Sequence, residues 1–130
     1  MSFKDDLGDQ GALLPRIATG FGAGIGRRGS LCGAFTGSMM VLGMMFGRTE
    51  AADKVRKERS LALGYRFWDL FEKENGSCTC YNLIQCHLDN AEERKRWLDS
   101  GGLETCRTVV GRTARLLHDF IEVEKRGGKE

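Results

Sequence analysis

Cysteine is the residue type in this chain with the clearest capacity for chemistry, because its thiolate binds soft metals and attacks disulfides. The 130-residue sequence holds five of them, Cys32, Cys78, Cys80, Cys86 and Cys106. The N-terminus lacks the basic start, apolar run and small-residue cleavage site of a secretory signal. We therefore expect a cytoplasmic protein, where thiols are kept reduced. This setting favours metal binding or redox chemistry over a framework of structural disulfides.

The spacing of the cysteines matches no common short metal-binding motif. No Cys-x-x-Cys occurs, so zinc-ribbon and ferredoxin patterns are absent, and covalent c-type haem has no support without Cys-x-x-Cys-His. Cys78 and Cys80 are too close in sequence for an unstrained disulfide. Any shared site must therefore be assembled by the fold.

Other chemical signals are weaker. We expect His87 and His118 at the polar surface, although His87 is the better candidate ligand because it follows Cys86. No Ser-His-Asp or paired-carboxylate arrangement can be argued from spacing. Glycines at positions 22, 24 and 26 resemble a phosphate-binding loop only superficially, because no strand precedes them and no Lys-Ser/Thr follows. We expect a tight connection with positive φ angles there.

The charge pattern limits the partners. Twenty basic and eighteen acidic residues give a formal net charge of +2, with the two signs interleaved. There is no basic stripe with interleaved aromatic residues, so no nucleic-acid partner is expected. The uncharged stretch 30–46 would span about 25 Å as a helix, short of a hydrocarbon core of roughly 30 Å, so no membrane span is expected.

The elements that must position the cysteines are predicted to be helical. Proline occurs once and β-branched runs are scarce, which favours an all-α fold. We predict a compact bundle of about five helices around a glycine- and methionine-rich central helix. Residues 1–130 should form one domain, with flexible ends over residues 1–10 and 126–130.

The central helix is predicted within residues 29–47, with Ser30 as its N-cap and Gly47 as its C-terminal stop. Each internal glycine costs roughly 1 kcal/mol relative to alanine. Neighbouring backbone or a bound group is therefore expected to press against the three glycines Gly33, Gly37 and Gly43.

Hydrophobic periodicity predicts the other helices. A short one is expected over residues 11–18, with Pro15 in its first turn, and longer ones over residues 50–75, 90–99 and 103–125. The apolar face of the helix over 50–75 is predicted to contain Leu61, Tyr65, Trp68 and Phe71, widened by Leu63, Phe67 and Leu70. The inward stripe of the last helix is predicted to contain Cys106, Val109, Val110, Thr113, Leu117, Phe120 and Ile121.

Three cysteines are then expected near helix starts: Cys32, Cys80 and Cys106. A short helix beginning near Cys80 would bring Cys86 to the same centre only if it ends close to Cys86. Backbone N–H groups at helix starts stabilise thiolates and can donate hydrogen bonds to cluster sulfurs. The arrangement suits a cysteine-ligated metal or iron–sulfur centre.

The sequence from about Leu14 onward resembles the family of redox-active proteins named for the cysteine pattern C_GCAxxG_C_C. The resemblance is carried by the segment 16–29, by Cys32-Gly-Ala-Phe-Thr-Gly37 followed by Met40-Val-Leu-Gly43, by Cys80-Tyr-Asn-Leu-Ile-Gln-Cys86, and by Cys106. It implies a small helical, cysteine-dependent redox protein of mainly anaerobic prokaryotes. Some members are domains of haem proteins, where these cysteines are suited to iron–sulfur ligation.

One departure from the family pattern bears on the site. Family members usually begin with a helix that carries a further cysteine ahead of the glycine-rich segment, and this sequence is expected to lack it. Cys78, His87 or a second subunit could then complete the site, and apolar surface left on the central helix would favour a homodimer.

The leading hypothesis is an electron-transfer protein in which four thiolates hold an iron–sulfur cluster, [2Fe–2S] being the expected type. The ligands would be Cys32, Cys80, Cys86 and Cys106, surrounded by Gly33, Gly37 and Arg28. Its partner would be another electron-transfer protein. Three alternatives stay open: metal-free thiol–disulfide chemistry, with pairs such as Cys32–Cys80 or Cys86–Cys106, a structural zinc site, and a helical interaction module whose cysteines belong to the core.

Overall fold

The structure is a computed structural model that describes residues 5–127, with side chains described from residue 8 onward. It is all-α, as predicted: the described residues contain no β-strand, and one isolated bridge joins Leu31 to Thr79. In chain order the elements are η1 (Asp5–Leu13), α1 (Leu14–Ala18), η2 (Thr19–Phe21), α2 (Gly22–Ile25), α3 (Gly33–Phe46), α4 (Lys54–Asn75), α5 (Cys80–Ile84), α6 (Ala91–Asp99) and α7 (Leu103–Gly127).

The ends that were expected to be flexible are only partly covered by the structure. Residues 1–4 and 128–130 lie outside the described residues. Residues 5–10 belong to η1, and residues 126–127 belong to α7.

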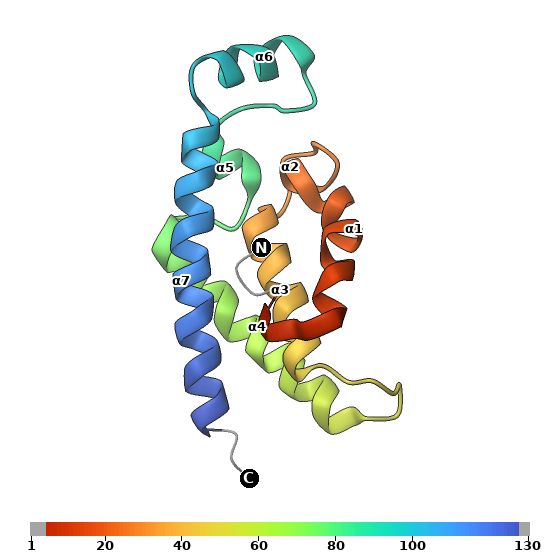
Figure 1. The fold of residues 1–130 in the computed structure, drawn as a ribbon. Coiled ribbons are helices and arrows are strands. Elements are labelled where there is room, and N and C mark those ends of the chain that lie inside the picture. The colour runs from red at the N-terminus through yellow and green to blue at the C-terminus, as the bar shows by residue number, and fades with distance from the viewer. Residues whose placement is uncertain (1–4, 128–130) are drawn as a thin grey trace.

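Three long helices, α3, α4 and α7, pack against one another and form the body of the molecule. In Figure 1, α7 and α1 lie on opposite sides of α3, and α6 stands beyond the ends of α5 and α7. Local capping explains several of the boundaries. The carboxylate of Asp53 accepts a hydrogen bond from the N–H of Arg56 at the start of α4, and Gly76 ends that helix with φ +93°.

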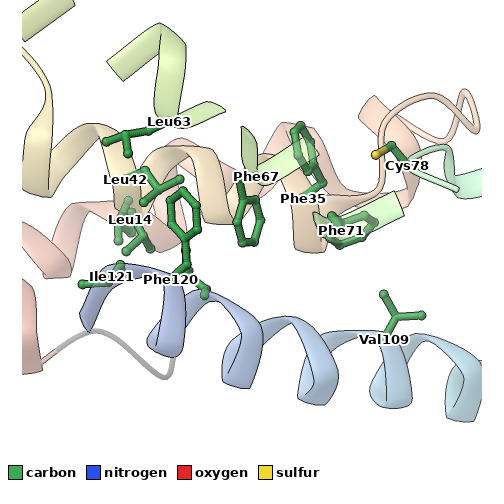
Figure 2. Close-up of a cluster of buried hydrophobic side chains, with 12 residues drawn as sticks. Leu14, Phe35, Leu42, Leu63, Phe67, Phe71, Cys78, Val109, Phe120 and Ile121 are labelled. Atoms are coloured by element: carbon green, nitrogen blue, oxygen red, sulfur yellow. The ribbon is translucent and has the colours of Figure 1, made fainter. Parts of the chain in front are cut away.

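The core is built mainly from phenylalanine and leucine side chains of these three helices (Figure 2). The ring of Phe35 on α3 lies 6.1 Å from that of Phe67 and 5.5 Å from that of Phe71, both on α4. Phe67 in turn meets Phe120 on α7, with ring centroids 5.4 Å apart. Such stacked and edge-to-face pairs stabilise the contacts among the three helices.

The predicted apolar face of α4 needs correction. Leu63, Phe67 and Phe71 are fully buried, whereas Leu61 and Tyr65 are 58% and 77% exposed. Leu63, Phe67 and Phe71 all belong to the predicted face, whereas its other members, including Trp68 and Leu70, are exposed. The Leu63–Phe67–Phe71 side is the buried one because α3 and α7 both pack against it. Gly64 leaves room there for the side chain of Met39.

The central helix begins later than predicted and is less crowded. Cys32, rather than Ser30, is the N-cap of α3, because the backbone of residues 30–32 pairs with residues 78–80. A Cβ on Gly37 or Gly43 would meet no described atom within 4 Å, so within the described chain no neighbouring backbone presses on these two glycines. For Gly33 the nearest atom would be the carbonyl oxygen of Phe21 at 3.8 Å, an ordinary contact.

Candidate functional site

Three cysteines from three elements line one cavity of about 220 Å³. Cys32 is the N-cap of α3, Cys80 is the first residue of α5, and Cys106 lies in the first turn of α7. The rest of the lining is glycine, alanine and branched aliphatic residues: Ala23, Gly24, Gly33, Ala34, Leu83, Ile84, Val109 and Val110. The cavity lining is therefore apolar, and its reactive groups are the three thiols.

A short pairing between two distant segments positions the first two cysteines. The bridge between Leu31 and Thr79 is antiparallel, the N–H of Cys32 donates to the carbonyl of Cys78 at 2.8 Å, and the N–H of Cys80 donates to the carbonyl of Ser30 at 2.6 Å. Because these bonds use backbone groups, they hold Cys32 and Cys80 together without occupying their side chains.

A left-handed turn forms the wall behind Cys80. Residues 23–27 all have positive φ angles, from 56° at Ala23 to 69° at Gly24 and Arg27. Ala23, Ile25 and Arg27 carry side chains, for which this conformation costs roughly 1–2 kcal/mol per residue. The N–H of Gly26 donates to the carbonyl of Gly20 at 3.0 Å, which helps to hold the turn. Backbone strain of this kind is typical of functional sites.

Cys106 reaches the cavity from the long C-terminal helix. It is half-buried and precedes the inward stripe of Val109, Thr113 and Leu117, which are buried as predicted. Val110 also lines the cavity but is 54% exposed, so it belongs to the rim of the site and not to the core.

Cys86 lies just past the C-terminus of α5, as predicted, because Gln85 ends that helix with φ +53°. Its side chain is 2% exposed and does not line the 220 Å³ cavity. Instead it shares a second buried cluster with Cys80 and Leu88, and its Sγ lies 3.9 Å from the carbonyl oxygen of Glu93. Cys86 thus lies beside Cys80 but does not line the cavity that Cys32 and Cys106 share with Cys80.

The remaining candidates lie outside the cavity, except Gly33, which lines it. Cys78 is 1% exposed in the main core, with its Sγ 3.8 Å from the carbonyl oxygen of Trp68. Arg28 lines a smaller hollow of about 80 Å³ beside Cys86 and His87. Gly37 is absent from the cavity lining.

Both histidines have exposed side chains, as predicted. The Nδ1 atom of His87 lies 3.2 Å from a carboxylate oxygen of Glu93, and its ring lies 4.6 Å from that of Tyr81. These contacts tie the segment after α5 to Glu93 on α6 and to Tyr81 on α5, so His87 has a structural role.

The thiols in and around the cavity favour the protonated form. Burial, and after it the charges of three neighbouring cysteines, raises the pKa of Cys80 to about 11. Burial and then the charge of Cys32 also raise the pKa of Cys106. Without a positive centre between them, the thiols of Cys80 and Cys106 stay neutral at physiological pH.

The described residues contain no group of three or more His, Cys, Asp or Glu side chains that converges closely enough to hold a single metal ion. A zinc ion requires its sulfur ligands at about 2.3 Å from one point. The thiols of Cys32, Cys80 and Cys106 instead lie around the cavity and do not converge on one point. This arrangement suits a larger group better than a single ion.

Sequence reasoning missed several residues of this site. The aliphatic lining from Leu83, Ile84 and Val110 and the left-handed residues Ala23 and Ile25 carry no chemical signal of their own. The alternating glycines from position 20 to 26 predict a tight connection with positive φ angles, and this is confirmed, since φ is +69° at Gly24 and +60° at Gly26.

Comparisons with known proteins agree with the cysteine pattern. Neither the comparison with curated proteins nor that with solved structures found a match. The comparison with protein families matches residues 1–120, which include all five cysteines. The chain therefore belongs to the family described as "Putative redox-active protein (C_GCAxxG_C_C)".

Proposed function

We propose that this member of the redox-active family is an electron-transfer protein whose redox group is an iron–sulfur cluster of the [2Fe–2S] type. Cys32, Cys80 and Cys106 would supply three thiolates, and Cys86, the buried neighbour of Cys80, the fourth. The observation that carries the proposal is the meeting of three thiols from distant parts of the sequence around one apolar cavity.

The donor set fits such a group. Thiolates are the usual ligands of iron–sulfur clusters, and a cluster needs them spread around several atoms and not converging on one. The aliphatic walls exclude water, which tunes the potential of a bound cluster. When bound, the cluster accepts and releases an electron, while the chain's own residues hold it and keep solvent away.

The protonation of the thiols argues against metal-free disulfide chemistry at neutral pH. At neutral pH the raised pKa values of Cys80 and Cys106 leave both thiols protonated and therefore poor nucleophiles. Iron takes the place of these protons when thiolates bind it. The same burial that slows disulfide exchange is thus compatible with metal binding.

The rim of the cavity suits exchange of electrons with a partner protein. Gly33 and Val110 both line the cavity and are both exposed, so a partner could approach there without opening the fold. No helix within residues 5–127 is both long enough and apolar enough to span a bilayer.

The direct test is purification and reconstitution with iron and sulfide under anaerobic conditions. We expect a coloured protein that contains iron and acid-labile sulfide, and a reversible one-electron midpoint in a spectroscopic redox titration. A colourless, iron-free protein after reconstitution would overturn the proposal.

Serine variants of the cysteines assign the ligands. Cys32→Ser, Cys80→Ser and Cys106→Ser should each lose most of the bound iron, and Cys86→Ser should lower it. Cys78→Ser is the matched control, because Cys78 is buried but lies off the cavity. Equal iron content in all five variants would refute cysteine ligation.

The same experiments separate the alternatives. Elemental analysis that finds zinc in place of iron would indicate a structural metal site. A reversible two-electron midpoint in metal-free protein, with Cys32 and Cys80 giving up two electrons and two protons to an added disulfide, would indicate thiol–disulfide chemistry.

A further inference from the structure

The outer side of α4 carries an apolar stripe that the fold leaves uncovered. Leu61, Tyr65 and Trp68 are spaced four and three residues apart, so they lie on one face of the helix. Their exposed fractions are 58%, 77% and 37%. Tyrosine and tryptophan are enriched where protein surfaces bind one another.

A hollow of about 640 Å³ lies beside this stripe, between α3 and α4. Its floor includes Gly64 and the side chains of Phe35 and Met39, and the three stripe residues form its walls together with Asp69. We call this stripe and hollow the α4 face. It is a contiguous apolar surface and not a set of scattered exposed residues.

The two ends of α4, before and after this face, carry opposite net charges. The N-terminal part, residues 54–60, has four basic residues (Lys54, Arg56, Lys57, Arg59) and one acidic residue, Glu58, a net charge of +3. The C-terminal part, residues 69–75, has three acidic residues (Asp69, Glu72, Glu74) and one basic residue, Lys73, a net charge of −2. All of these side chains are exposed. By helical spacing, Lys54 and Lys57 at one end and Asp69 and Glu72 at the other lie on the side of the stripe.

We propose that the α4 face binds a second copy of this chain, with the two α4 helices antiparallel across a two-fold axis. A two-fold axis perpendicular to the helices places the basic end of each α4 opposite the acidic end of its partner. A parallel arrangement would place like charges together. The apolar stripe of one subunit then covers the same stripe of the other subunit. Tyr65 of each subunit lies beside the hollow of its partner.

The exposed stripe of this surface lies on α4, whereas the surface expected from sequence was on the central helix, which contributes Phe35 and Met39 to the hollow. It is also independent of the cysteine site, because the residues of the α4 face do not line the cysteine cavity. A failed iron reconstitution would therefore leave the dimer proposal untouched, and the reverse also holds.

The first test measures the molar mass of the full chain at increasing protein concentration by sedimentation equilibrium, with reductant present to prevent disulfides between subunits. We expect a monomer–dimer equilibrium. Tyr65→Glu should weaken it by about tenfold or more. Ile17→Glu is the control, because Ile17 is an exposed hydrophobic residue (57%) that lies on α1 and away from the α4 face. Circular dichroism checks that both variants keep their helix content.

Charge reversal tests the antiparallel orientation. One variant carries Lys54→Glu and Lys57→Glu, and the other carries Asp69→Lys and Glu72→Lys, all four being charged residues on the stripe side of α4. Each variant alone should dimerise more weakly than the natural chain, because both ends of its α4 then have the same sign. Mixing the two should restore a dimer, because one α4 is acidic and the other basic.

Three results would overturn the proposal. A wild-type monomer at every concentration would mean that another partner covers the face. A dimer that Ile17→Glu weakens as much as Tyr65→Glu would place the interface elsewhere. A mixture of charge variants that stays monomeric would exclude the antiparallel arrangement.

Discussion

Gly24 lies directly against Cys80: a Cβ built on Gly24 would be 2.7 Å from the Cβ of Cys80 and 2.6 Å from the backbone nitrogen of Ser30. Real Cβ atoms do not approach other heavy atoms this closely, so the position admits glycine alone without movement of the backbone. The left-handed turn therefore fixes where Cys80 stands relative to the cavity. Because Gly24 has no side chain, the turn can pack directly against Cys80 and hold its thiol in position.

Replacing Gly24 by alanine should destabilise the protein by about 2–4 kcal/mol, because the new methyl group meets backbone and φ is +69°. Gly26→Ala is the control in the same turn, since φ there is +60° but nothing lies within 4 Å of the added atom. It should cost only about 1–2 kcal/mol. Urea unfolding of the metal-free, reduced protein measures both, and equal losses would refute the close approach to Cys80.

Filling the cavity should separate stability from cluster binding. Ala34 lines the cavity, and Ala34→Leu would occupy part of its 220 Å³ with hydrocarbon. We expect the metal-free protein to keep its fold, since apolar burial offsets crowding. Bound iron after reconstitution should fall by about tenfold or more relative to wild type. Ala12→Leu, at an exposed position in η1, is the control and should leave the iron content unchanged.

Wild-type iron content in Ala34→Leu would contradict this cavity as the binding site. Loss of helix content in the same variant would instead show crowding of the fold, and the smaller Ala34→Val would then replace it in the same comparison.

The sequence predicted those parts of the fold that depend on one segment at a time. The inward stripe of α7 from Val109 to Ile121 follows from helical spacing alone, and the position of Cys86 past the end of α5 follows from the length of that helix. For the same reason the placement of Cys80 and Cys106 near helix starts could be predicted. These features depend on local backbone geometry.

The features that depend on packing between distant segments of the chain could not be predicted in this way. Two apolar stripes overlap on α4, and only the packing of Phe35 and Phe120 against Phe67 decides which one is buried. The pairing of Leu31 with Thr79 moves the start of α3 from Ser30 to Cys32. The position of Cys86 likewise involves residues outside 80–86, since its Sγ lies 3.9 Å from the carbonyl oxygen of Glu93 on α6.

The buried thiol of Cys78 should make the metal-free protein less stable at alkaline pH. Burial, followed by the charge of Glu72, raises its pKa from 9.0 to about 11. Between these values the unfolded chain releases the thiol proton while the folded chain keeps it, so stability falls as pH rises through this window. One such thiol contributes a loss of about 2–3 kcal/mol.

Cys78→Ala tests this linkage. The variant should lose less stability than wild type between pH 9 and 11, when each is compared with its own value at pH 8 in urea unfolding of reduced, metal-free protein. The remaining loss belongs to the other buried thiols, whose pKa values are also raised. Superimposable pH curves for the two proteins would contradict the raised pKa of Cys78.

The helix α6 should be the first part of the described chain to open, because none of its residues is buried. Glu93 is one of its attachments: its carboxylate accepts a hydrogen bond from the backbone N–H of His87 at 2.9 Å and lies 3.2 Å from the His87 ring. The backbone hydrogen bond from His87 is the main cause that lowers the pKa of Glu93 below its usual 4.5. The attachment is therefore present at pH values above the lowered pKa of Glu93, and it is lost as the pH falls through that pKa.

Removing the carboxylate should reproduce the acid effect at neutral pH. In Glu93→Ala we expect faster amide hydrogen exchange across residues 91–99, with unchanged protection in α3, α4 and α7, because α6 opens without disturbing the core. Glu92→Ala is the control, since Glu92 is the exposed neighbour in the same first turn of α6. Exchange that is equally fast in both variants would mean that the helix dipole, and not the contact with His87, holds α6 in place.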